Sequence, residues 1–224
     1  MNTYQEFVDL SGPEPVRGFL HTPDRPSTGA LILTHGAGAN CQAALLVVLA
    51  EAFSAEGLSV LRCDLPFRQE RPQGPPIRTA DRDQAGLHAA VESMRRLPGP
   101  CSPARVFLGG HSYGGRQASM LAADEPGLVN ALLLLSYPLH PPKRPDQLRT
   151  QHFPSLRTPA LFVSGVRDGF GTIPEMQAAL RLVSARTELS PVQAAGHELI
   201  TKRNRDELPR KVVGEFLDFV RIEP

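Results

Sequence analysis

The residues with the clearest chemical potential are a serine, an aspartate and a histidine that lie far apart in the chain. Ser112 is the centre of "GHSYG" (residues 110–114), a G-x-S-x-G pattern between an apolar run and a helical pattern. Asp168 and His197 each follow a later apolar run. A serine hydroxyl becomes a nucleophile when a histidine takes its proton and a carboxylate orients that histidine. The order Ser, Asp, His therefore predicts Ser112 as nucleophile, His197 as base and Asp168 as the orienting acid.

Other histidines and acids in the chain could compete for these roles. His140 lies in a Pro-rich segment after an apolar run, and it is the main alternative base. Asp64 precedes the serine, so we expect it to anchor its own loop, and Asp146 is a weaker alternative acid. His111 adjoins Ser112, so its ring cannot easily turn back to the hydroxyl. Chain order favours His197 and Asp168 over these alternatives.

The reaction would also need donors for the negative charge that develops on the substrate oxygen. The backbone N–H of Tyr113, directly after the nucleophile, is one candidate. The second is expected in the small-residue loop "HGAGAN" (residues 35–40), and we assign it to the N–H of Ala37. A flexible strand-to-helix turn is the alternative interpretation of this loop. The sequence thus predicts an oxyanion hole made by Ala37 and Tyr113.

These residues need a scaffold in which strands alternate with helices. Apolar and alternating runs predict strands at 6–10 and 16–21 (an antiparallel hairpin), 30–36, 58–66, 104–110, 130–138, 159–165 and 187–196, the last broken by Pro191. Helical spacing is found at 41–57, at 79–97 with Thr79 as N-cap, from near Ser112, from near Ile173 and at 207–222. Buried strands that alternate with helices indicate a mostly parallel, eight-stranded sheet covered on both faces.

Two Pro-rich segments, 65–78 and 137–159, follow the carboxyl ends of strands and are expected to be loops. Ligands bind at that edge of open α/β sheets. Basic residues concentrate in these loops and near the catalytic positions, and they suggest a substrate with a carboxylate or phosphate. Solvated loop charge is the alternative explanation. The residues concerned are Arg68, Arg71, Arg78, Arg116, Lys143, Arg144, Arg149 and Arg167.

Composition narrows the class of protein. The chain has 224 residues, 41% of them hydrophobic, and a net charge of +1, which predicts one domain over residues 1–224 and argues against nucleic-acid binding. No apolar run is long enough to span a membrane, and no secretory signal is visible. Cys41, Cys63 and Cys101 lack the spacing of a disulfide framework or metal site, so we expect buried thiols and a cytoplasmic setting. The sequence does not indicate an oligomeric state.

The motifs together resemble those of α/β-hydrolases, from "ALILTHGAGAN" to "AAGHELI". More narrowly, "THGAGAN", "DLPFR", "GGHSYGGR", "YPLHPP" and "SGVRDGFG" are similar to the small lidless group related to dienelactone hydrolase and to testis-expressed hydrolase-like proteins. The resemblance implies an α/β-hydrolase fold with a minimal lid near residues 140–153. It also implies a triad of Ser112, Asp168 and His197. Dienelactone hydrolases usually carry cysteine where this chain has Ser112.

We therefore expect a serine hydrolase that cleaves a carboxylic ester or thioester of a small molecule, without a metal or organic cofactor. His35, Arg68 and His140 are candidate substrate contacts at the rim. The alternative is a hydrolase-fold scaffold or binding protein without catalysis, since some relatives in the narrower group act within protein assemblies and fold does not dictate function.

Overall fold

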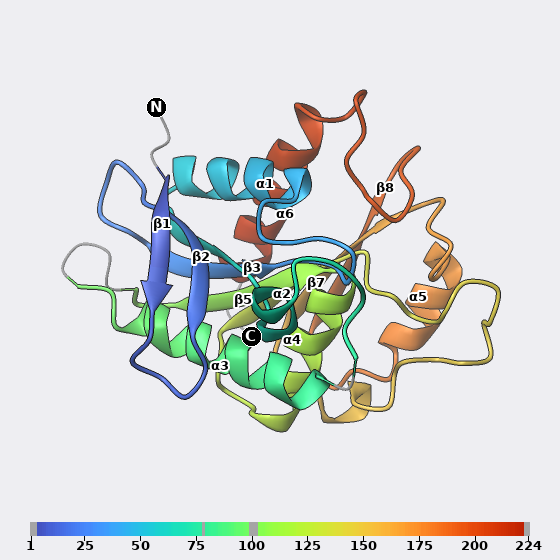
Figure 1. Cartoon of the computed structure of the whole chain (residues 1–224). Helices are drawn as coiled ribbons and strands as arrows, with labels where there is room; N and C mark the ends of the chain where they lie inside the picture. Colours follow the sequence, from blue (N-terminus) through green and yellow to red (C-terminus); the bar gives the residue numbers. More distant parts are fainter. Residues whose placement is uncertain (1–3, 78, 99–102, 222–224) are drawn as a thin grey trace.

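The architecture is an eight-stranded sheet between two layers of helices (Figure 1). The computed structural model describes residues 4–77, 79–98 and 103–221. The strand order is β1-β2-β4-β3-β5-β6-β7-β8. The strands are β1 (Tyr4–Asp9), β2 (Val16–His21), β3 (Gly29–Thr34), β4 (Leu58–Cys63), β5 (Val106–His111), β6 (Ala131–Leu135), β7 (Ala160–Gly165) and β8 (Thr187–Val192).

Six neighbouring strands of the sheet, β4, β3, β5, β6, β7 and β8, run parallel to one another. At one edge, β1 and β2 form an antiparallel hairpin, and β2 pairs antiparallel with β4. This arrangement confirms the predicted mostly parallel sheet. Every residue of β3, β4, β5, β6 and β7 is buried, as expected for strands covered on both faces. Because parallel strands end at the same edge, the segments after β3, β5, β7 and β8 can meet there.

Two hydrophobic cores lie on opposite faces of the sheet. One includes α1 and α6, and the other includes α3, α4 and α5 (Figure 1). The helices are α1 (Ala44–Ala55), α2 (Pro66–Glu70), α3 (Ala80–Arg95), α4 (Tyr113–Asp124), α5 (Ile173–Leu180) and α6 (Glu207–Arg221), with a short 3₁₀ helix η2 (Phe153–Ser155). Within the described ranges, no helix is both long and apolar enough to cross a bilayer.

Two local expectations differ from the structure, and a third, the N-cap of α3, is confirmed in position only. Pro191 does not break the last strand. Because β8 is an edge strand, it has a neighbouring strand on one side only, and a proline can face its open side without loss of a hydrogen bond between strands. The segment 65–78 is not entirely loop: it begins with α2, which has Pro66 in its first turn. Thr79 occupies the N-cap of α3, but its hydroxyl donates to the carboxylate of Asp83 rather than capping a backbone N–H.

The cysteines Cys41 and Cys63 are buried free thiols, as predicted. Burial raises the pKa of the Cys41 thiol to about 12, and burial also raises the pKa of Cys63. Both thiols are therefore protonated and unreactive at neutral pH. Cys101 and Arg78 lie outside the described residues.

Candidate active site

The turn between β5 and α4 places Ser112 at the carboxyl edge of the sheet. Its backbone has φ 52° and ψ −115°, a conformation that L-residues rarely adopt. The turn is possible because its neighbours lack side chains. A Cβ on Gly110 would lie 2.8 Å from the Thr34 carbonyl oxygen, and one on Gly114 would lie 2.6 Å from the His35 carbonyl oxygen. The glycines thus let α4 begin directly against β3, with the serine at the tip.

The three residues singled out in the sequence meet at this edge. His197 Nε2 is 2.8 Å from Ser112 Oγ, and His197 Nδ1 is 2.9 Å and 3.0 Å from the two carboxylate oxygens of Asp168. A carboxylate accepts, so Nδ1 carries the proton. The Nε2 lone pair then faces the serine hydroxyl. Asp168 is only 5% exposed, whereas His197 and Ser112 are half-buried.

The imidazole of His197 is held from two sides. The ring of Phe170 stacks on it at a centroid distance of 4.1 Å, and the Phe170 N–H donates to Asp168 Oδ1 at 2.8 Å. His111 Nε2 lies 2.8 Å from the carbonyl oxygen of His197, so this nitrogen is the donor. Burial lowers the pKa of His111, which keeps it neutral with the proton on Nε2. His111 therefore does not face the serine hydroxyl; it holds the backbone of the histidine that does.

The backbone amides assigned to the oxyanion hole are those of Ala37 and Tyr113. Within the part of the chain that the structure describes, neither Ala37 N–H nor Tyr113 N–H donates to another residue. Tyr113 is the first residue of α4, where backbone N–H groups have no partner inside the helix. The partial positive charge of the helix N-terminus acts at the same point. An anionic oxygen could be received there.

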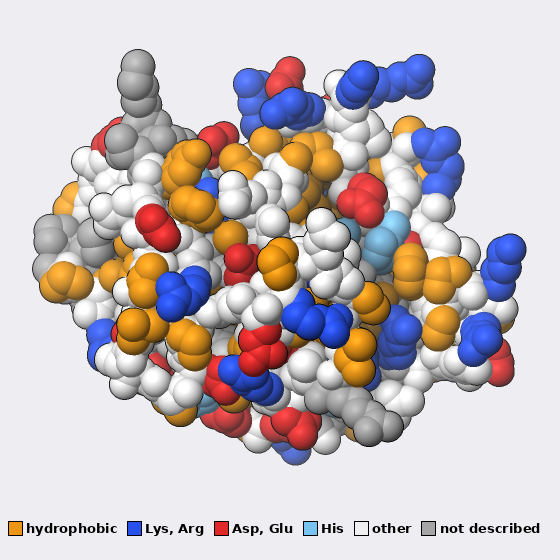
Figure 2. Space-filling view, in the orientation of Figure 1, with side chains coloured by type: hydrophobic (Ala, Val, Ile, Leu, Met, Phe, Trp, Pro, Cys, Tyr) orange, Lys and Arg blue, Asp and Glu red, His pale blue; other side chains and the backbone are white. Residues whose placement is uncertain are grey.

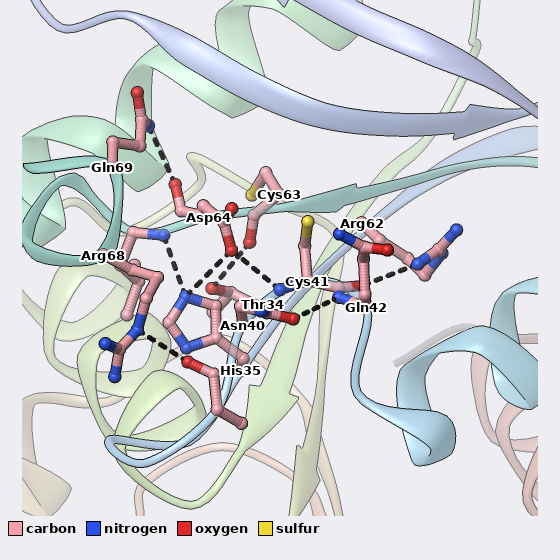
Figure 3. A network of polar contacts seen from close by, with 12 residues as sticks. Thr34, His35, Asn40, Cys41, Gln42, Arg62, Cys63, Asp64, Arg68 and Gln69 are labelled. Atoms are coloured by element: carbon pink, nitrogen blue, oxygen red, sulfur yellow. Dashed lines mark hydrogen bonds and ion pairs between the residues drawn. The ribbon is translucent and has the colours of Figure 1, made fainter. Parts of the chain in front are cut away.

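Arg68 fixes the loop that carries Ala37. Its guanidinium donates from Nε to the Ala39 carbonyl (2.8 Å) and from Nη2 to the Ala37 carbonyl (2.7 Å). It also donates to the carbonyls of Arg71 (3.0 Å) and Gly74 (3.0 Å). Arg68 is only 5% exposed, and Figure 3 shows it turned toward the loop next to His35. Because the planar fork bonds two carbonyls of one short loop, it restricts how the Ala37 amide can point.

A second set of contacts joins the same loop to the end of β4 (Figure 3). Asp64 Oδ1 accepts from the backbone N–H of Cys41 at 2.7 Å, so Asp64 holds the loop between β3 and α1. His35 donates from Nδ1 to the Gly36 carbonyl (2.8 Å) and accepts at Nε2 from Leu65 N–H (3.2 Å). Burial lowers the pKa of His35. It is therefore neutral, and its 3.4 Å approach to Asp64 is not an ion pair.

Three residues expected at the substrate are placed within the protein framework instead. His35 is completely buried, and the guanidinium group of Arg68 donates its hydrogen bonds to backbone carbonyls. His140 is 5% exposed; its Nδ1 donates to the Pro141 carbonyl at 2.8 Å, and its Nε2 lies 3.5 Å from Glu175. The structure therefore assigns His35 and Arg68 to the oxyanion loop and His140 to the loop after β6.

Sequence reasoning missed the supporting residues Phe170, His111 and Asp83. Asp83 is a completely buried carboxylate that accepts from the hydroxyl of Tyr113 at 2.7 Å and from the backbone N–H of Phe67 at 3.1 Å. It joins α3 to the residue after the nucleophile. One sequence signal could have indicated Asp83: helical spacing places this carboxylate on the buried face of its helix. Phe170 and His111 carry no such signal, because their partners are distant in the chain.

The sequence belongs to the α/β-hydrolase domain family, whose model matches residues 27–221. Two Mycobacterium tuberculosis proteins, named provisionally as phosphoribosyl transferases, are 23% identical over 214 residues. The alignment covers 96% of this chain but 46% of theirs, so the chain spans about half the length of these curated relatives.

Solved structures share the fold over nearly the whole chain. Dienelactone hydrolase from Anabaena variabilis has a TM-score of 0.76 at 21% identity, covering 97% of this chain and 98% of its own. Est1E from Butyrivibrio proteoclasticus has a TM-score of 0.77 at 16% identity, covering 98% and 99%. The Pyrococcus furiosus esterase Pf2001 has a TM-score of 0.73 at 16% identity, covering 98% and 91%. At these identities the likeness establishes the α/β-hydrolase fold.

Proposed function

We propose that this protein is a serine hydrolase that cleaves a carboxylic ester or thioester of a small molecule through an acyl-enzyme. The supporting observation is the hydrogen-bonded series of Ser112, His197 and Asp168, with successive distances of 2.8 Å and 2.9 Å. A binding or scaffold role would not require a base within hydrogen-bond reach of the serine hydroxyl. The buried, reduced thiols suit a cytoplasmic setting.

In the proposed reaction, Ser112 Oγ attacks the carbonyl carbon as His197 Nε2 takes its proton. Asp168 stays ionised, fixes the tautomer of His197 and stabilises the imidazolium that forms. The N–H groups of Ala37 and Tyr113 bind the oxyanion; one such donor typically contributes roughly 3–4 kcal/mol to the transition state. His197 then returns the proton to the leaving group, and a water molecule, deprotonated by His197, releases the acid.

This proposal is tested by labelling Ser112 with a fluorophosphonate and by assaying 4-nitrophenyl acetate. We expect stoichiometric labelling of the wild type, no labelling of Ser112→Ala, and a loss of turnover of at least about 10³-fold in that variant. Ser136→Ala is a matched control, because Ser136 is another positive-φ serine after a strand but lies outside the triad. Unlabelled wild type, or equal turnover by Ser112→Ala, would favour the scaffold interpretation.

A further inference from the structure

A groove of about 470 Å³ lies between α1 and α6, the two helices that cover one face of the sheet. Ala52 and Ala55 of α1 and Val213 and Leu217 of α6 give it apolar walls. On the α6 side it is open at Gly214, where a Cβ would meet nothing within 4 Å. Side chains of another molecule therefore have room to enter the groove there.

The solvent side of α6 carries charged residues in a regular order. Glu207, Arg210, Gly214, Asp218 and Arg221 are all exposed. At 3.6 residues per turn, the four charged positions fall within roughly 40° of Gly214 around the helix axis. They form one straight stripe along the helix, and all of its residues except the first also line the groove.

The charges of this stripe are complementary to themselves. Arg210 lies four positions before Gly214 and Asp218 four positions after it; Glu207 lies seven before and Arg221 seven after. In an antiparallel pair of identical helices that cross at Gly214, each residue lies opposite the position equally far on the other side of the crossing. Arg210 would then face Asp218 of the partner subunit. Glu207 would face Arg221 of the partner subunit, and symmetry makes each pair twice.

These charges are available to a partner. Ion pairs among the described residues do not include Glu207 or Arg210. Asp218 and Arg221 pair at 3.1 Å, but both side chains are 73% exposed, and such a surface pair contributes little. At the top of Figure 2, where Figure 1 places the start of α6, basic and acidic side chains lie next to each other. A partner of one sign would be repelled by half of the stripe, whereas a second copy matches both signs.

We propose that two copies of this chain associate through α6, antiparallel, with the two-fold axis beside Gly214. The apolar walls of the two grooves then cover each other, and the charged pairs fix the register. A helix of 15 residues is about 22 Å long, so the interface lies at the small end of dimer interfaces and depends strongly on charge matching. The inference does not depend on the proposed hydrolase function, because α6 covers a face of the sheet and Ser112 lies at its carboxyl edge.

The charge match is tested by sedimentation equilibrium of the full chain over a series of protein concentrations. We expect the wild-type mass to rise toward that of two chains, with weaker association at higher salt, because the charged pairs lie at the surface. Arg210→Glu should raise the dissociation constant at least about tenfold, since it places like charges opposite each other twice in the dimer. Adding Asp218→Arg to this variant restores opposite signs and should recover most of the affinity.

Arg181→Glu is the matched control, because it makes the same change of charge at an exposed residue after α5, in the helical layer on the other face of the sheet. It should associate as the wild type does, and thermal unfolding verifies that each variant is folded. A wild-type mass of one chain at every concentration would overturn the proposal. Equal weakening by Arg181→Glu and Arg210→Glu, or no recovery on adding Asp218→Arg, would overturn it as well.

The register is tested with a short bismaleimide cross-linker in a Cys101→Ser background, in which the remaining native thiols are buried. Gly214→Cys should cross-link two copies, because this position lies beside the two-fold axis. Glu207→Cys should not cross-link to itself, since its two copies would lie about 20 Å apart, but it should cross-link to Arg221→Cys when the two variants are mixed. Efficient cross-linking of Glu207→Cys to itself, or none by Gly214→Cys, would contradict the antiparallel pairing.

Discussion

At the scale of single residues, the position of His197 depends on neighbours that take no part in proton transfer. His111 donates to its backbone carbonyl, and Phe170 stacks on its ring. Ring orientation matters because Nε2 must stay within hydrogen-bond reach of Ser112 Oγ while Nδ1 stays on the carboxylate. The proposed base is therefore oriented through both its backbone and its ring, besides the bond to Asp168.

His111→Phe should lower kcat by about tenfold, because one hydrogen bond to the His197 loop is lost and a carbonyl is left without its donor. His111→Gln should recover most of the loss, since its amide nitrogen can donate from a place similar to Nε2. Steady-state kinetics with 4-nitrophenyl acetate measures the effect, and KM should change little. Equal kcat values for the Phe and Gln variants would show that the hydrogen bond does not position His197.

At the scale of elements, the site depends on how closely α4 approaches β3 and on how the loop between β3 and α1 is held. The close approach of α4 to β3 requires glycine at positions 110 and 114, because Cβ atoms there would meet backbone oxygens of β3 and of the loop that follows it. The loop between β3 and α1 is held by Arg68 and Asp64, which belong to the segment after β4. Each contact joins elements that are separate in sequence.

Gly114→Ala should destabilise the fold by about 1–3 kcal/mol, because the new methyl group would lie 2.6 Å from both the His35 carbonyl oxygen and Thr34 Cγ2. Gly214→Ala in α6 is the matched control, since its Cβ would meet nothing within 4 Å. That substitution should stabilise the protein by about 0.5–1 kcal/mol through helix propensity. Urea unfolding of both variants checks these opposite signs; destabilisation by both would argue against the close contact as the cause.

Arg68→Lys should lower kcat by about tenfold or more, with a smaller change in KM, because an ammonium cannot bond the Ala37 and Ala39 carbonyls in one plane. The charge is kept, so a loss would be due to geometry rather than to electrostatics. Arg71→Lys is the control: Arg71 is exposed, and within the described residues its side chain donates a hydrogen bond only to the Pro75 carbonyl. If both variants keep wild-type kcat, the Arg68 contacts do not position the oxyanion loop.

At the scale of the whole molecule, stability should fall below neutral pH because the buried His21 and the half-buried His152 resist protonation. Burial and the charges of Arg62 and Arg116 lower the pKa values of His21 and His152 to about 4, from the ordinary 6.5. Between pH 6.5 and 4 the unfolded chain binds more protons than the folded one. The free energy of unfolding is therefore largest above pH 6.5 and falls with decreasing pH, by up to about 1–3 kcal/mol for each histidine.

The measurement is urea unfolding at pH 7, 5.5 and 4.5. His152→Gln should show a shallower fall in unfolding free energy than the wild type, by about one proton in the slope across this window. His88→Gln is the control, because His88 has a half-exposed side chain beside Glu125. Parallel pH profiles for the wild type and His152→Gln would contradict the assignment of this loss to His152.

Much of the fold could be predicted, because the patterns that specify it are local. Buried strands show as continuous apolar runs, and the turn at Ser112 shows as glycines on both sides of the serine. The prediction that Pro191 breaks the last strand is wrong, because the edge position of β8 is a property of the whole sheet and cannot be read from the local sequence. Thr79 occupies the predicted N-cap of α3, but its hydroxyl donates to the nearby Asp83 carboxylate instead of bonding a backbone N–H.

Local sequence patterns are enough to predict the alternation of strands and helices, the sharp turn at residue 112, and the chain order of a serine, an acid and a histidine. These follow from hydrophobic periodicity and backbone sterics, which act over a few residues. The inward direction of Arg68 and the bond from His111 to the backbone of His197 are set by packing between distant segments. The direction of a long polar side chain depends on which carbonyls and charges distant segments bring within its reach, and that is a property of packing.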